Sequence, residues 1–494
     1  MKQKAVRMVA IILVAMLLLT MIISVVASSV RAEAGDQNVY TMDITLREDE
    51  QALLISQRLS YFNDTGDALD RVVFAVYANQ FRRQSAIQYE TDAALPYGYL
   101  PGGLAFTSVK VNGEAVEFGF LDENELFLRV PCELAPGEGC EIELEYAALL
   151  TQNAGFFGAG AVDWRLSGFY PLACLYQGGE WITNRPVQHA RYIYAAPADY
   201  DVIITLPREY QIAATGAAEA METADDQTTW RVTARGIREF SISAGRAWRA
   251  HTDQTPSGVA VTVYTGSRLG ARRALDTALE TIELYESWFG AFPVAQIAIA
   301  ASDYALDRIA FSGAIWLNAE LFEYTNRDQL AYQLRYALAE QYFALAVHAD
   351  PLADAWMAVS VCEYTAYLAL EEQEGYDAFV RALNGRVADA LQVTVPGDQF
   401  ITASAAAFSQ AQFDLVVRDR GAAVMHETRV AMGREAFLAS LARYYADYQN
   451  RTFVAERDLV QAMDDATGGD WEGFVTDMLF HIDEYAEHTL DWYE

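Results

Sequence analysis

The side chains best suited to hold a metal or act as a nucleophile are few in this chain of 494 residues. Zinc sites use about four ligands drawn from imidazole, thiolate and carboxylate, and two ligands on one helix stand four residues apart. No two of the histidines are four apart, and His426-Glu427 is followed by Val430 at the next ligand position. The six are His189, His251, His348, His426, His481 and His488. No standard zinc motif is present.

The four cysteines are Cys132, Cys140, Cys174 and Cys362, and none forms a C-x-x-C pair. A zinc cluster is therefore not expected. Cys132 and Cys140 flank the turn E-L-A-P-G-E-G between two alternating segments. A short hairpin disulfide in an oxidising exterior is one interpretation, and two unpaired thiols are the other, because the sequence does not set the offset across the turn.

The N-terminus is typical of a targeting element. Three basic residues among the first seven precede an almost unbroken apolar run at 8–27, and an A-x-A cleavage site stands at 32–34. The run is long for a signal peptide and long enough to span a bilayer. A cleaved signal peptide and an uncleaved membrane anchor both place residues from 35 onward outside the cytoplasm. We expect an extracytoplasmic protein, anchored in the cell membrane or secreted.

Composition limits the partners. The chain is 52% hydrophobic and 21% charged, which suits two or three globular domains with large cores. Its formal charge is −33, and loss of residues 1–34, with four basic residues and one acidic residue, would leave about −36. Such a surface repels nucleic acids and anionic lipid headgroups, so a nucleic-acid partner is excluded from the interpretation.

Two periodicities divide the chain and predict an α+β fold. Up to about residue 248, short alternating segments separated by turn residues predict a β-sandwich or saddle-shaped sheet. These segments include 40–46, 52–63, 71–79, 140–149, 199–206 and 228–234.

From residue 268 the period becomes helical, starting with an amphipathic helix at 274–290 that ends in glycine. A strand is predicted at 295–301 and an edge strand at 310–318. The helices predicted after residue 328 are 329–348, 352–373, 376–391, parts of 403–433, 434–449 and 456–467.

Several phrases in this order resemble the alanyl aminopeptidase family, peptidase family M1 of the gluzincins. Residues 334–376 have the aromatic, acidic and apolar spacing of that family's H-E-x-x-H helix and the W-x-x-E-G-x-x-E-Y helix after it. The other phrases are LSYFNDTGDALDRVVFAVYAN (59–79), FYPLACLYQGGEW (169–181), ADYDVIITLPREYQIAATG (198–216), IELYESWFGAFPVAQIAIA (282–300) and RDRGAAVMHETRVAMGREAFLASLARYYADY (418–448). The resemblance implies a β-sandwich or saddle domain at 35–250 and a thermolysin-like helical domain at 251–494.

The resemblance also implies a degenerate site, because each functional residue of the family falls on a residue that cannot replace it. The glutamate that holds the substrate's amino group falls on Ala310, and the general-base glutamate on Ala337. The two zinc histidines fall on Tyr336 and Glu340, the third ligand, a glutamate, on Val359, and the oxyanion-stabilising tyrosine on Arg418. Without ligands and base, no metal is held and no water is activated. No cofactor is therefore predicted.

We expect structural roles for the neighbours of these positions. A carboxylate at Glu340 is expected to pair with Arg335, Arg418 or Arg420, since an unpaired buried charge is costly. The most specific form of this hypothesis is a salt bridge between Glu340 and Arg418 at the position that the zinc ion occupies in the family. Glu363 and Tyr364 match the family's E-Y and are expected beside or behind the pocket, Trp356 is expected in the core, and His348 on the surface.

Three functions are consistent with the sequence. The favoured one is a non-catalytic pseudopeptidase that binds a peptide or protein. The alternatives are an active zinc metallo-aminopeptidase with non-standard site residues and a structural ectodomain of a membrane complex. Fold alone does not decide among them.

Overall fold

The computed structural model describes residues 37–87, 95, 96, 98–187, 189, 193–224, 226–393 and 400–482. The targeting element predicted at 1–34 and His488 lie outside these residues. Within the described ranges, no helix is both long and apolar enough to cross a membrane.

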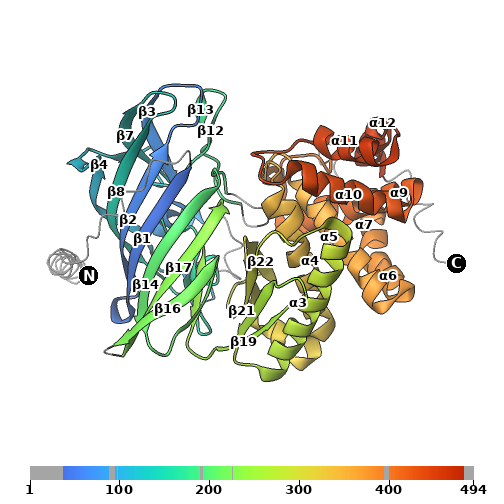
Figure 1. Ribbon diagram of the computed structural model, residues 1–494, viewed down its shortest axis with the longest axis horizontal. Coiled ribbons are helices and arrows are strands. Elements are labelled where there is room, and N and C mark those ends of the chain that lie inside the picture. Colours follow the sequence, from blue (N-terminus) through green and yellow to red (C-terminus); the bar gives the residue numbers. More distant parts are fainter. Residues whose placement is uncertain are drawn as a thin grey trace. The chain divides into compact units, whose positions relative to one another are not determined.

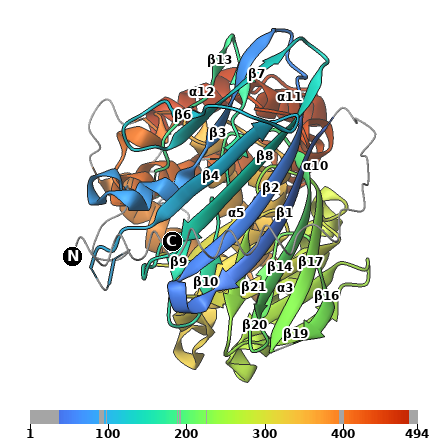
Figure 2. The same cartoon turned by 90° about the vertical axis from the view of Figure 1, so that its left-hand side faces the viewer.

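An eight-stranded sheet forms the larger layer of the β-rich part (Figures 1 and 2), in the order β16-β17-β14-β1-β2-β8-β4-β5. β1 and β14 are parallel, with Tyr40 opposite Tyr200, and the other neighbouring pairs are antiparallel. The strands are β1 (Asn38–Arg47), β2 (Ala52–Phe62), β4 (Gly103–Val111), β5 (Glu114–Ala115), β8 (Gly139–Leu149), β14 (Ala198–Pro207), β16 (Ala217–Ala224) and β17 (Gln227–Ile237).

Two four-stranded sheets share one hydrophobic core with the larger sheet, so the predicted sheet packing is confirmed. Their orders are β15-β18-β10-β9 and β11-β3-β7-β6, and β12 pairs with β13. Stacked rings of Tyr40 and Tyr200, 4.9 Å apart, lie in this core. The strands are β3 (Leu69–Ala75), β6 (Gly119–Phe120), β7 (Phe127–Leu134), β9 (Phe157–Ala159), β10 (Trp164–Leu166), β11 (Leu172–Ala173), β12 (Tyr176–Gln177), β13 (Glu180–Trp181), β15 (Gln211–Ala214) and β18 (Ile242–Gly245).

The cysteine pair is not arranged as the sequence suggested. Cys132 lies on β7 and Cys140 on β8, which belong to different sheets, so the turn between them joins two layers rather than two paired strands of a hairpin. Their sulfur atoms are 2.9 Å apart, and both cysteines are buried, like Cys174 and Cys362.

A five-stranded sheet, β19-β20-β21-β23-β22, follows. The single edge strand predicted at 310–318 is instead a hairpin of β22 and β23, and β23 also pairs with β21. Gly313 makes the turn because its φ of +76° strains other residues. The strands are β19 (Arg249–Gln254), β20 (Ala260–Thr265), β21 (Gln296–Ser302), β22 (Arg308–Phe311) and β23 (Ala314–Asn318).

Helices make up the rest of the chain. The first is capped by the Ser267 side chain, which accepts from the Gly270 N–H at 3.1 Å, and ends before Gly290 at φ +93°. The α-helices are α3 (Arg268–Phe289), α4 (Arg327–Glu340), α5 (Ala355–Glu374), α6 (Tyr376–Leu383), α7 (Asp389–Gln392), α8 (Gln410–Phe413), α9 (Gly421–Met432), α10 (Arg434–Tyr448), α11 (Glu456–Thr467) and α12 (Glu472–His481). The π-helical segments are η7 (Gln341–Ala346), η8 (Asn384–Ala388) and η10 (Asp414–Arg420).

The helical prediction holds for the long elements and misses their interruptions. The helix predicted at 329–348 changes to a π-helix at Gln341. The Gln341 side chain explains how this point is held, since it accepts from the Gly313 N–H at 3.0 Å and donates to the Phe311 carbonyl at 3.1 Å. The β22–β23 hairpin is thereby tied to the end of α4. No helix was predicted at α12.

Candidate functional site

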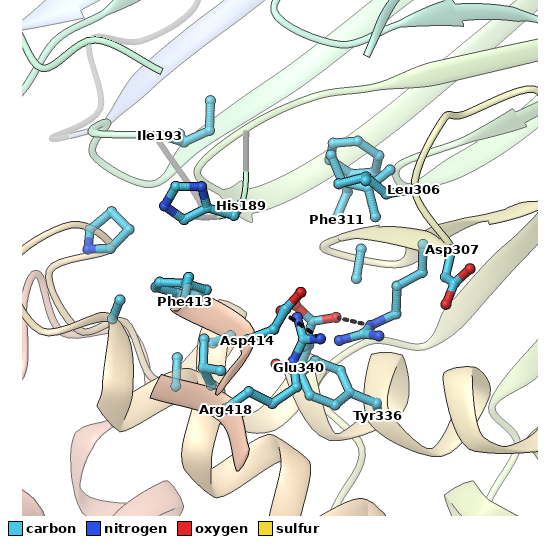
Figure 3. Close-up of a pocket in the computed structure, with 18 of the residues that line it drawn as sticks. His189, Ile193, Leu306, Asp307, Phe311, Tyr336, Glu340, Phe413, Asp414 and Arg418 are labelled. Atoms are coloured by element: carbon cyan, nitrogen blue, oxygen red, sulfur yellow. Dashed lines mark hydrogen bonds and ion pairs between the residues drawn. The ribbon is translucent and has the colours of Figure 1, made fainter. Parts of the chain in front are cut away.

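A cavity of about 370 Å³ lies where the loops of the β-rich part meet the helical part (Figure 3). The β-rich part contributes His189, Ile193 and Glu239. The rest of the described wall comes from β22 and the loop before it, α4, η7, the loop between η7 and α5, the start of α5, η8, α8 and η10. Hydrogen bonds join the two parts here: the Tyr194 hydroxyl donates to Asp350 Oδ1 at 2.6 Å. The cavity is therefore built from segments far apart in the sequence.

Five of the six positions singled out by the sequence line this cavity. They are Ala310 on β22, Tyr336 and Glu340 on α4, Val359 on α5 and Arg418 on η10. Tyr336 and Glu340 are four residues apart, so they share one face of α4. Ala337 is fully buried among apolar side chains and is not part of the lining.

Glu340 contacts an arginine that sequence reasoning missed. Arg308 Nε lies 3.4 Å from Glu340 Oε2, and its Nη1 donates to Gln333 Oε1. The guanidinium carbon is 3.4 Å from the centroid of the Tyr336 ring, a cation–π contact. The signal for this contact in the sequence is a charged residue at the start of the otherwise apolar segment R-I-A-F.

The three arginines proposed as partners of Glu340 make other contacts. Arg335 Nη2 pairs with Glu374 Oε1 at 2.6 Å, and Arg420 donates to the carbonyls of Ala390 and Val393. Arg418 Nη1 pairs with Asp414 Oδ1 at 2.7 Å, its neighbour one turn away on η10. The predicted partners of Glu340 were therefore wrong: its salt bridge is with Arg308, which precedes the strand predicted at 310–318.

Glu363 anchors a buried charge network next to the cavity wall. Its carboxylate is fully buried, and the Tyr332 hydroxyl lies 2.7 and 2.6 Å from its two oxygens. Arg386 Nη1 lies 3.5 Å from Oε1 and also donates to the Tyr332 hydroxyl, while Arg418 Nε lies 3.9 Å from Oε2. Glu363 therefore holds two arginines that line the cavity, Arg386 and Arg418, although it does not itself line it.

Asp419 lies in the same buried region. Burial, followed by the nearby Glu363 carboxylate, raises its pKa to about 7, against the opposing effect of Arg386 and Arg418. The Asp419 carboxyl therefore titrates near neutral pH.

The histidine predictions are partly wrong. His348 was expected on the surface but is 4% exposed, lines the cavity and stacks its ring on Phe453 at 5.7 Å. His189 also lines the cavity, and burial lowers its pKa, which favours the neutral ring. The loop after η7 that carries His348 is polar, so its sequence did not indicate that it packs against the β-rich part.

Tyr364 lies in the helical core instead of the cavity. It is fully buried, and its hydroxyl is 2.6 Å from His426 Nδ1. Burial lowers the pKa of His426 to about 3. The prediction of Trp356 as a core residue is confirmed, with 1% of its surface exposed.

The residues around Glu340 do not fit a zinc ion. Zinc needs imidazole, thiolate or carboxylate donors in a tetrahedral arrangement. Across the described ranges, no three His, Cys, Asp or Glu side chains are grouped so that they could hold a metal. Next to Glu340 stand an aromatic ring and the cationic Arg308, which supply no ligand atom.

Comparisons with known proteins were made by sequence and by structure. No model of a known protein family matches the chain. It is 25% identical over 416 residues to aminopeptidase N of Lactococcus lactis subsp. lactis, covering 76% of this chain and 46% of that protein. It is 25% identical over 230 residues to aminopeptidase M1-B of Oryza sativa subsp. japonica, covering 43% and 26%. The chain thus spans less than half the length of these curated relatives.

Solved structures match over most of the chain. An M1 zinc metallopeptidase from Deinococcus radiodurans superposes with a TM-score of 0.67 at 18% identity, covering 90% of this chain and 93% of that one. A mutant of that enzyme bound to a Tyr-Ser-Ala substrate gives a TM-score of 0.66, also at 18% identity, over 90% and 94%. The protein therefore has the two-domain fold of the M1 family of aminopeptidases.

Proposed function

We propose that this protein binds a peptide, or a peptide segment of another protein, in the cavity beside Tyr336 and does not hydrolyse it. The observation that carries the proposal is the cluster of Arg308, Tyr336 and Glu340 at the positions where the family resemblance expects two zinc ligands and their surroundings. The interior of the cluster is filled by side chains that contact one another.

The chemistry of this cluster supports binding over hydrolysis. Peptide hydrolysis of the metal-assisted type needs a polarised water and a base within hydrogen-bonding reach. Glu340 already accepts from the Arg308 guanidinium, and the alanine at 337 has no carboxylate and is buried in the core. These residues offer neither ligand set nor base for that reaction.

The cavity itself supports a ligand of peptide size. Its volume of about 370 Å³ falls within the range of ligand sites, and its wall combines apolar side chains with a few charged groups. A purely structural ectodomain, the third alternative, does not require such a space. An extracytoplasmic location is part of the proposal and is supported by the sequence of residues 1–34.

One experiment separates the three candidate functions. Purified protein is analysed for zinc and assayed with a chromogenic aminoacyl substrate, with and without excess zinc, and peptide binding is measured by calorimetry. We expect no stoichiometric zinc, no turnover and measurable peptide binding. Turnover that a chelator abolishes would establish the active zinc enzyme, and the absence of peptide binding would leave the structural role.

A further inference from the structure

Two arginines of the cavity wall lie around one ring, and each is paired with a carboxylate of the same wall, Glu340 or Asp414. The guanidinium carbons of Arg308 and Arg418 lie 3.4 and 5.9 Å from the centroid of Tyr336, and their side chains are 10% and 19% exposed. They come from β22 and η10, so the fold brings them together.

The contacts that Arg308 and Arg418 make within the protein do not use all of their guanidinium N–H groups. Each guanidinium has five N–H groups. Arg308 uses Nε on Glu340 and Nη1 on Gln333, and Arg418 uses Nη1 on Asp414. Arg418 Nε is buried without a hydrogen-bond partner, since Glu363 is 3.9 Å away. In the described part of the chain, the Nη2 groups of Arg308 and Arg418 have no acceptor.

Two aspartates of the cavity wall lie on the segment between η7 and α5. Asp350 accepts hydrogen bonds from Tyr194 and from the backbone N–H groups of residues 352 and 353. Asp354 lies four residues further on, and burial, with a smaller contribution from Asp350, raises its pKa. Within the described ranges neither carboxylate forms a salt bridge, so both can accept a cationic group of a ligand.

The length of one helical wall suits a short peptide. Tyr336 and Glu340 on α4 and Ala344 on η7 line this wall at intervals of four residues, and His348 lies just beyond the end of η7. The eight helical residues from Tyr336 to Ala344 rise roughly 12 Å, which is the length of three or four extended residues. Ala358, Val359 and Phe413 add apolar surface to the cavity.

We propose that the cavity takes a peptide of three or four residues, or the end of a longer chain, with its C-terminal carboxylate between Arg308 and Arg418 and its cationic end toward Asp350 and Asp354. The guanidinium N–H groups without acceptors are the geometry that carboxylates fit. This orientation rests on the proposed peptide-binding function. It adds which end of the peptide binds between the two arginines.

The test compares three forms of one probe, tetraalanine, by isothermal titration: the free acid, its C-terminal amide and its N-acetylated form. Loss of a charge-assisted hydrogen bond predicts that the amide binds at least about tenfold more weakly than the acid. The acetylated form is expected to lose about two- to fivefold, because Asp350 and Asp354 are only half-buried and water screens their charges.

Variants assign the effect to the arginines. Arg308→Gln is expected to reduce the difference between acid and amide to less than about threefold, and Arg308→Lys to retain part of it. Arg335→Gln is the matched control, because Arg335 pairs with Glu374 and does not line the cavity. Arg418→Gln provides a second test if the first variant folds poorly.

The two proposals fail in different ways. Equal binding of acid and amide to the natural protein would overturn the orientation while leaving peptide binding in place. Binding that is lost on N-acetylation but unaffected by amidation would overturn it too. No binding of any of the three forms would overturn the peptide-binding function and the orientation together.

Discussion

Replacing Glu363 by leucine tests whether the buried charge network holds the cavity wall. The carboxylate is fully buried and is the shared partner of Tyr332, Arg386 and Arg418. Leucine has a similar volume, so the main change is electrostatic. It would leave a buried hydroxyl without its carboxylate and two arginines without their common counter-ion.

The magnitude follows from the geometry. A hydrogen bond to a charged group contributes about 1.5–3 kcal/mol, and removing one partner of a buried ion pair costs about 3–5 kcal/mol. Arg386 is 38% exposed and Arg418 19%, so water screens part of the loss, and we expect about 3 kcal/mol. For a domain of about this size that corresponds to a decrease in Tm of about 6–12 °C.

Scanning calorimetry is the suitable assay, because it separates the transitions of the two parts of the chain. Glu363→Gln, which keeps an acceptor for Tyr332, should lose about half as much, and Tyr332→Phe in a double-mutant cycle should show coupling. Asp276→Ala is the control, since its pair with Arg272 is exposed. A Tm for Glu363→Leu within about 2 °C of the natural protein would refute the assignment of a stabilising role to this network.

Three further predictions follow from the same structure. Because burial raises the folded-state pKa of Asp419 from 3.8 to about 7, the folded state binds more protons than the unfolded state between these values, and stability should fall as pH rises from about 4 to about 7. Asp419→Asn should flatten that dependence in thermal unfolding followed at several pH values, and an unchanged slope would contradict it. If the chain is exported, non-reducing peptide mapping should find Cys132 linked to Cys140, whose sulfur atoms are 2.9 Å apart, and quantitative alkylation of both would argue against the pairing. Finally, the triple variant Tyr336→His, Glu340→His, Val359→Glu should gain one equivalent of zinc by metal analysis, since all three positions line one cavity; failure of the folded variant to bind zinc would show that these positions do not converge on one ion.

Many features of the fold could be predicted because their causes are local. Alternation of buried and exposed residues in segments such as 40–46 reflects the two-residue period of a strand, and the four-residue interval from Tyr336 to Glu340 places both on one helix face. The same periodicity could not show that residues 310–318 turn at Gly313, nor that α4 becomes a π-helix at Gln341. Both features depend on hydrogen bonds between the Gln341 side chain and the backbone of the β22–β23 hairpin, which are not local in the sequence.

The sequence by itself determined the acidic character of the chain and the strand-then-helix order. Only the tertiary structure decided that Arg308 contacts Glu340, that Arg418 turns to Asp414 and Glu363, and that His348 is buried. Side-chain type and periodicity report only on contacts between residues that are close in the sequence. The partner of a buried charge depends on which distant segments pack against it, and the free energy of that packing is shared by the whole core.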